Sequence, residues 1–271
     1  MLKSLYIVIL LTLSVEAAWA NETKEKKHIL FLGASVDWAH DSVSHAMYTM
    51  EKIGKESGLF DVRFHTDLEL LTKEKLGSNK KNLNYFDAIM FFSQGDLLLT
   101  EQQKTDIMSF IKEDGKGFLG THSATDSFRA SWPEYIEMVG GAFDSHPWHQ
   151  KVRIRVEDRT FPITKHLPPI FEITDEIYQL DHYSRSDKRV LMSLDTTSID
   201  LNAKNVRRSD RDFAIAWARQ WGTGRVFVNL LGHRREVWDN PSIQKIWLEA
   251  VRWVLKFTHA DLTPLPQPTQ D

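Results

Sequence analysis

The sequence predicts a three-layer α/β sandwich: a mostly parallel central sheet, helices on both faces, and an antiparallel extension. Three observations carry this prediction. Short apolar runs end in glycine or polar residues, as strands buried on both faces do. Segments of helical periodicity alternate with these runs in the first half of the chain. After about Gly140 the pattern changes, and one run alternates apolar and charged residues.

The first half is expected to supply four strands and two helices. The predicted strands span residues 28–33, 60–66, 85–92 and 117–120. One helix is expected to begin at about Ser42, capped by Asp41 or Ser42, and to stop at Gly58. The second spans residues 100–113, with Thr100 as its cap. Helices between successive strands are typical of βαβ units and of a parallel sheet.

The second half is expected to add the antiparallel strands and a last helix. In residues 151–156 charged and apolar residues alternate, as in a strand with one solvent-exposed face. Residues 143–149 are expected to form a loop. Two further short strands are predicted at 176–180 and 190–194. A hairpin around Gly222-Thr-Gly224 joins 213–219 to 225–231, and a helix covers 242–257.

The two ends of the sequence are expected to lie outside the folded domain. Residues 1–20 have a basic start, a short apolar run and Ala18-Trp-Ala20, the pattern of a secretory signal peptide, with an uncleaved anchor as the alternative. The sequence therefore predicts export to the periplasm or the exterior, with no membrane span after cleavage. Residues 21–27 are expected to be disordered, 28–258 to form one domain, and 259–271 a loose tail.

Composition excludes several classes of function. A net charge of −3 and a pI near 6.4 argue against nucleic-acid binding, which normally needs a basic face. The chain has no cysteine, which excludes thiol chemistry and disulfides. Gly120-Thr-His-Ser123 is not the Gly-x-Ser-x-Gly elbow of serine hydrolases. Acid–base chemistry, metal-assisted chemistry and binding alone remain.

Histidines recur just past the ends of the predicted strands. His40, His122 and His233 each follow such a strand, and His146 lies in a segment rich in aromatic residues. In open α/β sheets, ligands bind outside the carboxyl ends of the strands, so these side chains are candidates for one site. The competing interpretation is structural, because turns need small polar residues and His122 could cap a helix.

Histidine titrates near neutral pH and suits general acid–base catalysis. Nearby carboxylates could orient such a base or bind sugar hydroxyls; they are Asp126, Asp175, Glu176 and Asp181. Scattered histidines and carboxylates can also hold zinc or a similar ion, so a divalent metal cofactor stays open. Tryptophans near the turns suit polyhydroxylated ligands, although the nine tryptophans can equally fill the core.

Several motifs, in one order, resemble the ThuA-like (trehalose utilisation) family over roughly residues 28–257. They are His40-Asp-Ser-Val43, Gly117-Phe-Leu-Gly-Thr-His-Ser-Ala-Thr-Asp126, Trp132-Pro-Glu-Tyr135, Gly140-Gly-Ala-Phe-Asp-Ser-His-Pro147, Asp175-Glu-Ile-Tyr178, Ala216-Trp217 and Gly224-Arg-Val-Phe-Val-Asn-Leu-Leu-Gly-His233. This chain departs from the family at Phe161, where histidine is common, and at Ala214, where proline is common. The resemblance implies a flavodoxin-like fold of the class I glutamine amidotransferase type. That fold carries a cysteine on a sharp turn where this chain has His122, so glutaminase activity is not expected.

The resemblance also implies a small carbohydrate ligand, specifically a sugar oxidised to a ketone at a ring carbon. Isomerisation or elimination would follow removal of a proton beside the ketone by His122 or His233. The residues assigned to catalysis are His122, His233 and Glu176, and those assigned to substrate binding are His40, Asp126, His146, Tyr178 and Trp217. A non-catalytic carbohydrate-binding protein and a metal-dependent glycoside or ester hydrolase are the alternatives.

Overall fold

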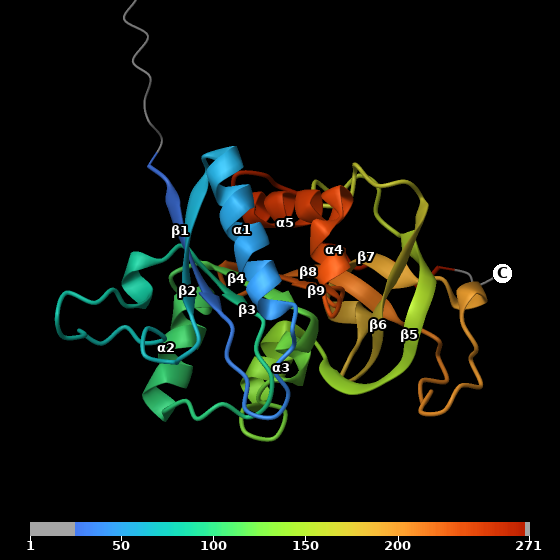
Figure 1. The fold of residues 1–271 in the computed structure, drawn as a ribbon, viewed down its shortest axis with the longest axis horizontal. Coiled ribbons are helices and arrows are strands. Elements are labelled where there is room, and N and C mark those ends of the chain that lie inside the picture. Colours follow the sequence, from blue (N-terminus) through green and yellow to red (C-terminus); the bar gives the residue numbers. More distant parts are fainter. Residues whose placement is uncertain (1–24, 269–271) are drawn as a thin grey trace, which may run out of the picture.

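The computed structural model describes residues 25–268 of the chain. Its nine strands form a single sheet in the order β2-β1-β3-β4-β9-β8-β7-β5-β6 (Figure 1). The predicted signal peptide and residues 21–24 lie outside the described part. Between residues 25 and 268, no helix combines the length and the apolar character needed to cross a membrane.

The strands are β1 Lys27–Leu32, β2 Phe60–His65, β3 Ala88–Phe91, β4 Gly117–Thr121, β5 Ala142–Val156, β6 Ile170–Asp181, β7 Arg189–Leu194, β8 Ala214–Trp221 and β9 Gly224–Asn229. The α-helices are α1 Val43–Ser57, α2 Glu101–Lys112, α3 Pro133–Val139, α4 Arg235–Asp239 and α5 Pro241–Val254. The predicted strands and the three longer helices match most of these elements to within a few residues. Two strands begin well before their predicted ranges, β6 at Ile170 and β5 at Ala142.

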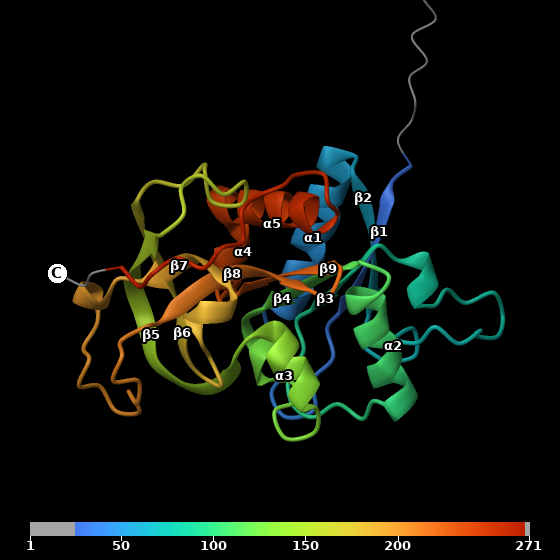
Figure 2. The same ribbon diagram turned by 180° about the vertical axis from the view of Figure 1, so that it is seen from behind.

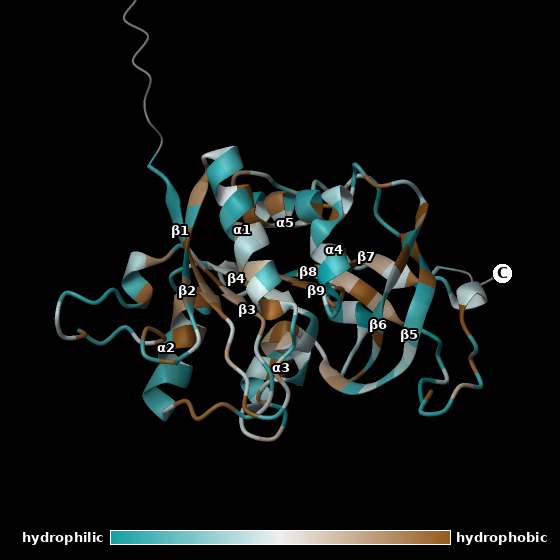
Figure 3. Cartoon of the chain, viewed as in Figure 1, coloured by the Kyte–Doolittle hydropathy of each residue, from teal (hydrophilic) through white to brown (hydrophobic). Residues whose placement is uncertain are grey.

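The first half of the sheet is parallel and buried on both faces. Strands β2, β1, β3, β4 and β9 pair in parallel, which is the flavodoxin-like strand order. Helices α1, α4 and α5 cover one face, and α2 and α3 cover the other (Figures 1 and 2). Along β1, Ile29 and Phe31 pack in the cluster beneath α1 and α5, whereas Leu30 and Leu32 pack toward α2 and α3. Apolar colour accordingly concentrates along the central strands (Figure 3).

The second half of the sheet is the antiparallel extension. Strands β9, β8, β7, β5 and β6 pair antiparallel in that order. The prediction that residues 143–149 form a loop is wrong, because they belong to β5 and pair with β6. Register shifts occur between Phe143 and Ser145 and between Ser145 and Trp148. These bulges break the two-residue alternation that would otherwise have indicated a strand.

The helix ends follow the sequence in part. Thr100 caps α2 as expected, and it does so in a capping box with Gln103. Gly58 ends α1 in a left-handed conformation. Ser42 occupies the cap position of α1, but its hydroxyl donates to the Gly232 carbonyl instead of capping the helix. Helices α3 and α4 were not predicted, because 7 and 5 residues are too few to show helical periodicity.

The segment expected to be a loose tail lies against the domain as far as it is described. Ala260 and Leu262 pack on the core beneath α5. The backbone carbonyl of Thr263 accepts a hydrogen bond from Arg189, and Gln267 donates one to the Asp210 carbonyl. The chain after α5 therefore closes over the outer part of the antiparallel extension.

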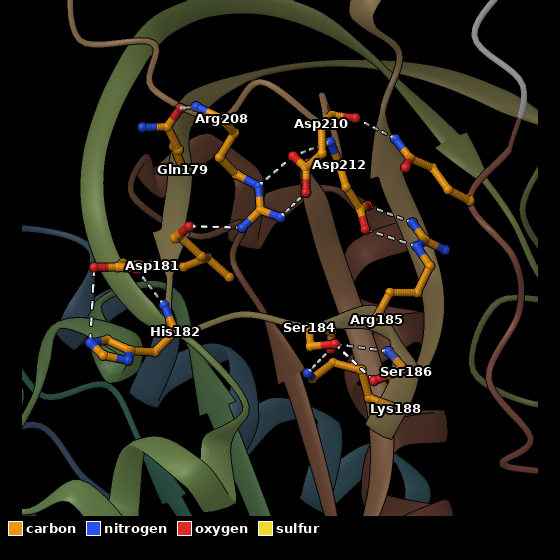
Figure 4. A network of polar contacts seen from close by, with 12 residues as sticks. Gln179, Asp181, His182, Ser184, Arg185, Ser186, Lys188, Arg208, Asp210 and Asp212 are labelled. Atoms are coloured by element: carbon orange, nitrogen blue, oxygen red, sulfur yellow. Dashed lines mark hydrogen bonds and ion pairs between the residues drawn. The ribbon is translucent and has the colours of Figure 1, made fainter.

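A buried ion-pair network links the loops that connect the strands of the antiparallel extension. Arg185 donates to both Glu157 and Asp212, and all three side chains are largely buried. Figure 4 shows Arg185 beside Asp212, with Arg208 and Asp210 paired next to them. The guanidinium is the shared partner that lets two carboxylates remain charged away from water.

Replacing Arg185 with alanine is expected to lower the free energy of unfolding by about 3–5 kcal/mol, because two buried carboxylates lose their partner. Urea unfolding followed by far-ultraviolet circular dichroism measures this. Arg159→Ala, at an exposed position with no part in this network, is the matched control and should change stability by less than about 0.5 kcal/mol. Equal effects of the two substitutions would contradict the structural role of the network.

Candidate active site

Three histidines from separate loops meet one carboxylate at the carboxyl edge of the parallel strands. His40 follows β1, His122 follows β4 and His233 follows β9, while Glu176 comes from β6 of the antiparallel extension. The ring centres of His40 and His122 lie 4.8 Å apart, and each lies 5.2 Å from that of His233. We call these four residues the His–Glu cluster. The structure thus brings together the three histidines that follow the strands.

His122 is the buried centre of the cluster. Its backbone φ of 45° places it in the left-handed region, where the chain turns sharply from β4 into a short 3-10 helix. The ring is fully buried, and its Nδ1 lies 2.9 Å from the Leu230 carbonyl oxygen. Its Nε2 lies 3.4 Å from Oε2 of Glu176 and 3.3 Å from Nδ1 of His233. The Tyr178 ring packs over it at 4.2 Å.

The loop that carries His233 is fixed from both sides. The carboxylate of Asp175 accepts the backbone N–H groups of Gly232 and Arg234 at 2.7 Å and 3.0 Å. Ser42 and Trp238 both donate to the Gly232 carbonyl. The N–H and C=O groups of Gly232 and the N–H group of Arg234 are thus held before any ligand arrives, and this preorganises the site.

Burial and close packing set the charges of the cluster. Burial alone would raise the pKa of Glu176, but the hydrogen bonds from His122 and His233 outweigh it and hold that pKa well below its usual range. The same hydrogen bond with Glu176 raises the pKa of His233. Burial, with His122 and His233 close by, lowers the pKa of His40 to about 3. Glu176 is therefore ionised and His40 is neutral at neutral pH.

A pocket of about 350 Å³ opens above the cluster. It is lined by Trp38, His40, Gln94, Asp126, Phe143, His146, Glu176, Tyr178 and His233. Trp38 is 64% exposed, an unusual exposure for so large an apolar ring. The Gln94 side chain accepts the backbone N–H of Trp38 and donates to Asp126, so it ties two walls together.

Most residues assigned from the sequence gather at this pocket. Asp126, His146 and Tyr178 line it together with the exposed part of the cluster, and Nδ1 of His146 lies 3.5 Å from Oε1 of Glu176. Trp217 does not reach it. Its side chain is fully buried in the core beside α3, where the indole N–H donates to the Val139 carbonyl. The Ala216-Trp217 motif thus serves packing.

Three lining residues were not assigned from the sequence. Gln94 follows β3 directly, so the rule that identified the histidines, polar residues just past a buried strand, could have found it. Trp38 was noticed only as one of several tryptophans near turns. Phe143 lies in the bulged part of β5, where the loss of alternation hid which side chains face the pocket.

The cluster also has the composition of a metal site. His40, His122, Glu176 and His233 each offer one ligand atom, and these atoms lie within 4.8 Å of one another. Imidazole nitrogens with a carboxylate oxygen are the donors that zinc takes in proteins. His146 and Asp126 stand outside this group.

The fold and the site together define a flavodoxin-like α/β protein with a histidine-rich pocket at the carboxyl edge of its sheet. The family described as ThuA, trehalose utilisation, matches residues 28–254, and the chain belongs to that family. No match was found among curated proteins.

Solved structures confirm the fold class. A ThuA-like protein from Bacteroides uniformis is similar with a TM-score of 0.69 and 24% identity, covering 87% of this chain and 94% of that one. A ThuA-like protein from Parabacteroides merdae has a TM-score of 0.68 and 17% identity, and the match covers 91% of this chain and 96% of that one. A cytoplasmic protein of Salmonella typhimurium has a TM-score of 0.56 and 10% identity, and the match covers 84% of this chain and 99% of that one. At these identities the likeness concerns the fold.

Trp217→Phe is expected to lower the free energy of unfolding by about 1–3 kcal/mol, because the buried Val139 carbonyl loses its donor. Urea unfolding followed by far-ultraviolet circular dichroism measures this. Unchanged stability would contradict the packing role of Trp217.

Proposed function

We propose that the protein is an exported enzyme of carbohydrate metabolism that acts on a sugar carrying a ketone in its ring. The observation that carries the proposal is the His–Glu cluster at the floor of a pocket of about 350 Å³, a volume suited to a sugar-sized ligand. Membership of a family described as trehalose utilisation supports carbohydrate as the ligand class. The pattern of residues 1–20 supports export.

The chemistry suited to such a site is proton removal beside the ketone. A C–H bond next to a carbonyl is acidic enough for a base that works near neutral pH. Loss of that proton leads to isomerisation or to elimination of a neighbouring substituent. Because His122 is fully buried and His233 lines the pocket, the cluster meets the substrate through His233.

The pocket walls supply groups that suit a sugar ring. The exposed face of Trp38 can stack on the apolar face of a sugar. Across the pocket, Asp126, Gln94 and His146 offer hydrogen-bonding groups for hydroxyls. Asp126 is held in place by Gln94 and Arg129, so its position is set before binding.

Substituting the cluster should abolish turnover of 3-keto-glucosides. His233→Ala and Glu176→Gln are each expected to reduce kcat/KM by about 100-fold or more, the range in which positioned acid–base groups contribute. Loss of substrate, followed by nuclear magnetic resonance, measures this.

Two variants serve as matched controls for this experiment. Glu172→Gln changes an exposed carboxylate of the same strand β6, and His45→Ala changes a histidine that pairs with Asp239 away from the pocket. Both should retain turnover. If the wild-type protein left every keto-sugar intact and only gained thermal stability from it, the protein would be a binder and the catalytic proposal would be lost.

A further inference from the structure

Three atoms of the His–Glu cluster form a nearly regular triangle. Nε2 of His122 lies 3.4 Å from Oε2 of Glu176 and 3.3 Å from Nδ1 of His233, and the third side measures 3.2 Å. Tetrahedral coordination with bonds of about 2.0–2.1 Å places neighbouring ligand atoms about 3.3–3.4 Å apart. The spacing of the three atoms is therefore that of ligands around one zinc-sized ion.

The hydrogen bond of His122 with Leu230 decides which of its ring nitrogens faces the cluster. The Leu230 carbonyl can only accept, so Nδ1 of His122 carries the hydrogen between them. Nε2 is therefore the ring nitrogen that faces Glu176 and His233. Oε2 of Glu176 and Nδ1 of His233 are the other two atoms at this point, so three atoms of the kinds that bind zinc converge there.

We propose that the His–Glu cluster binds a divalent transition-metal ion of the zinc type through His122, Glu176 and His233. His40 offers a fourth nitrogen within 4.8 Å, and its Nδ1 is buried without a hydrogen-bond partner. Catalytic zinc sites commonly combine histidines with one carboxylate and keep a position open for water or substrate. Glu176, His233 and His40 all line the pocket, so a ligand in the pocket would lie beside such an ion.

The surroundings of the three ligands match what metal sites require. Metal-binding histidines usually donate their other ring N–H to a carbonyl or carboxylate, as His122 does to Leu230. The backbone on either side of His233 is fixed by Asp175. The ligands are thus positioned without the ion, so binding requires little rearrangement.

The donor set also indicates which ions fit. Magnesium and calcium prefer ligand sets made of oxygen, whereas imidazole suits zinc, cobalt, nickel and iron. The absence of cysteine removes the thiolate that selects copper(I). Zinc and cobalt are therefore the probes for this site.

This inference rests on the proposed function for its substrate, but the binding of the ion does not depend on it. A bound divalent ion polarises a carbonyl oxygen or acidifies water, which is the assistance that proton removal beside a ketone needs. A bound ion would occupy Nδ1 of His233, and His146 or Asp126, which also line the pocket, would then accept the proton.

The full chain, stripped with a chelator and dialysed against Zn²⁺ or Co²⁺, should retain about one ion per chain by elemental analysis. Its unfolding temperature should rise with the concentration of free ion. His122→Ala and Glu176→Gln should each retain less than about a tenth of an ion, while Glu172→Gln and His45→Ala retain the wild-type amount. Because Glu176→Gln preserves the shape of the side chain, it decides the case if His122→Ala fails to fold.

Wild-type protein that stays free of metal, with an unfolding temperature that does not change with Zn²⁺ or Co²⁺, would overturn the inference. Equal retention by Glu176→Gln and the wild type would overturn it as well. The two proposals fail separately. Turnover of 3-keto-glucosides by a protein that retains no Zn²⁺ or Co²⁺ after dialysis would refute the ion but keep the function, and a bound ion without turnover would refute the function but keep the ion.

Discussion

The contact of Glu176 with the histidines is the interaction on which the site depends, because it joins the two halves of the sheet. His40, His122 and His233 come from loops at the carboxyl edge of the parallel half, whereas Glu176 comes from β6 in the antiparallel extension. Without that carboxylate, the three imidazoles would be packed together with no hydrogen-bonded carboxylate among them. The pKa of His233 is raised, and that of Glu176 is lowered, by this one contact.

Asp175, the residue before Glu176, also links the two halves of the sheet at this site. Asp175 points into the protein and holds the backbone around His233 through two N–H groups. Adjacent residues of a strand face opposite sides of the sheet. On β6, Glu176 therefore places its charge in the pocket, while Asp175 supports the His233 loop behind it. Burial raises the pKa of Asp175, which makes this support depend on its hydrogen bonds.

The elements that the sequence predicted well are those with clear periodicity. Runs such as Ile29–Leu32 are buried on both faces, as a parallel strand must be, and α1 and α2 show regular apolar stripes. The bulged start of β5 has no such regularity, so Phe143 went unassigned. The histidines were found because they follow strands, but the sequence carries no signal for which tryptophan faces a ligand. Trp217 filled the core, and Trp38 was left exposed at the pocket.

The division of the site between the two halves of the sheet bears on how it can be altered. The extension is held by its own ion pairs around Arg185, at a distance along the chain from the histidine loops. A substitution that loosens β6 can therefore withdraw the only acidic member of the cluster while the parallel core stays folded. Such a protein would look intact by its helix content and its compactness, yet its histidines would have lost the carboxylate that pairs with them.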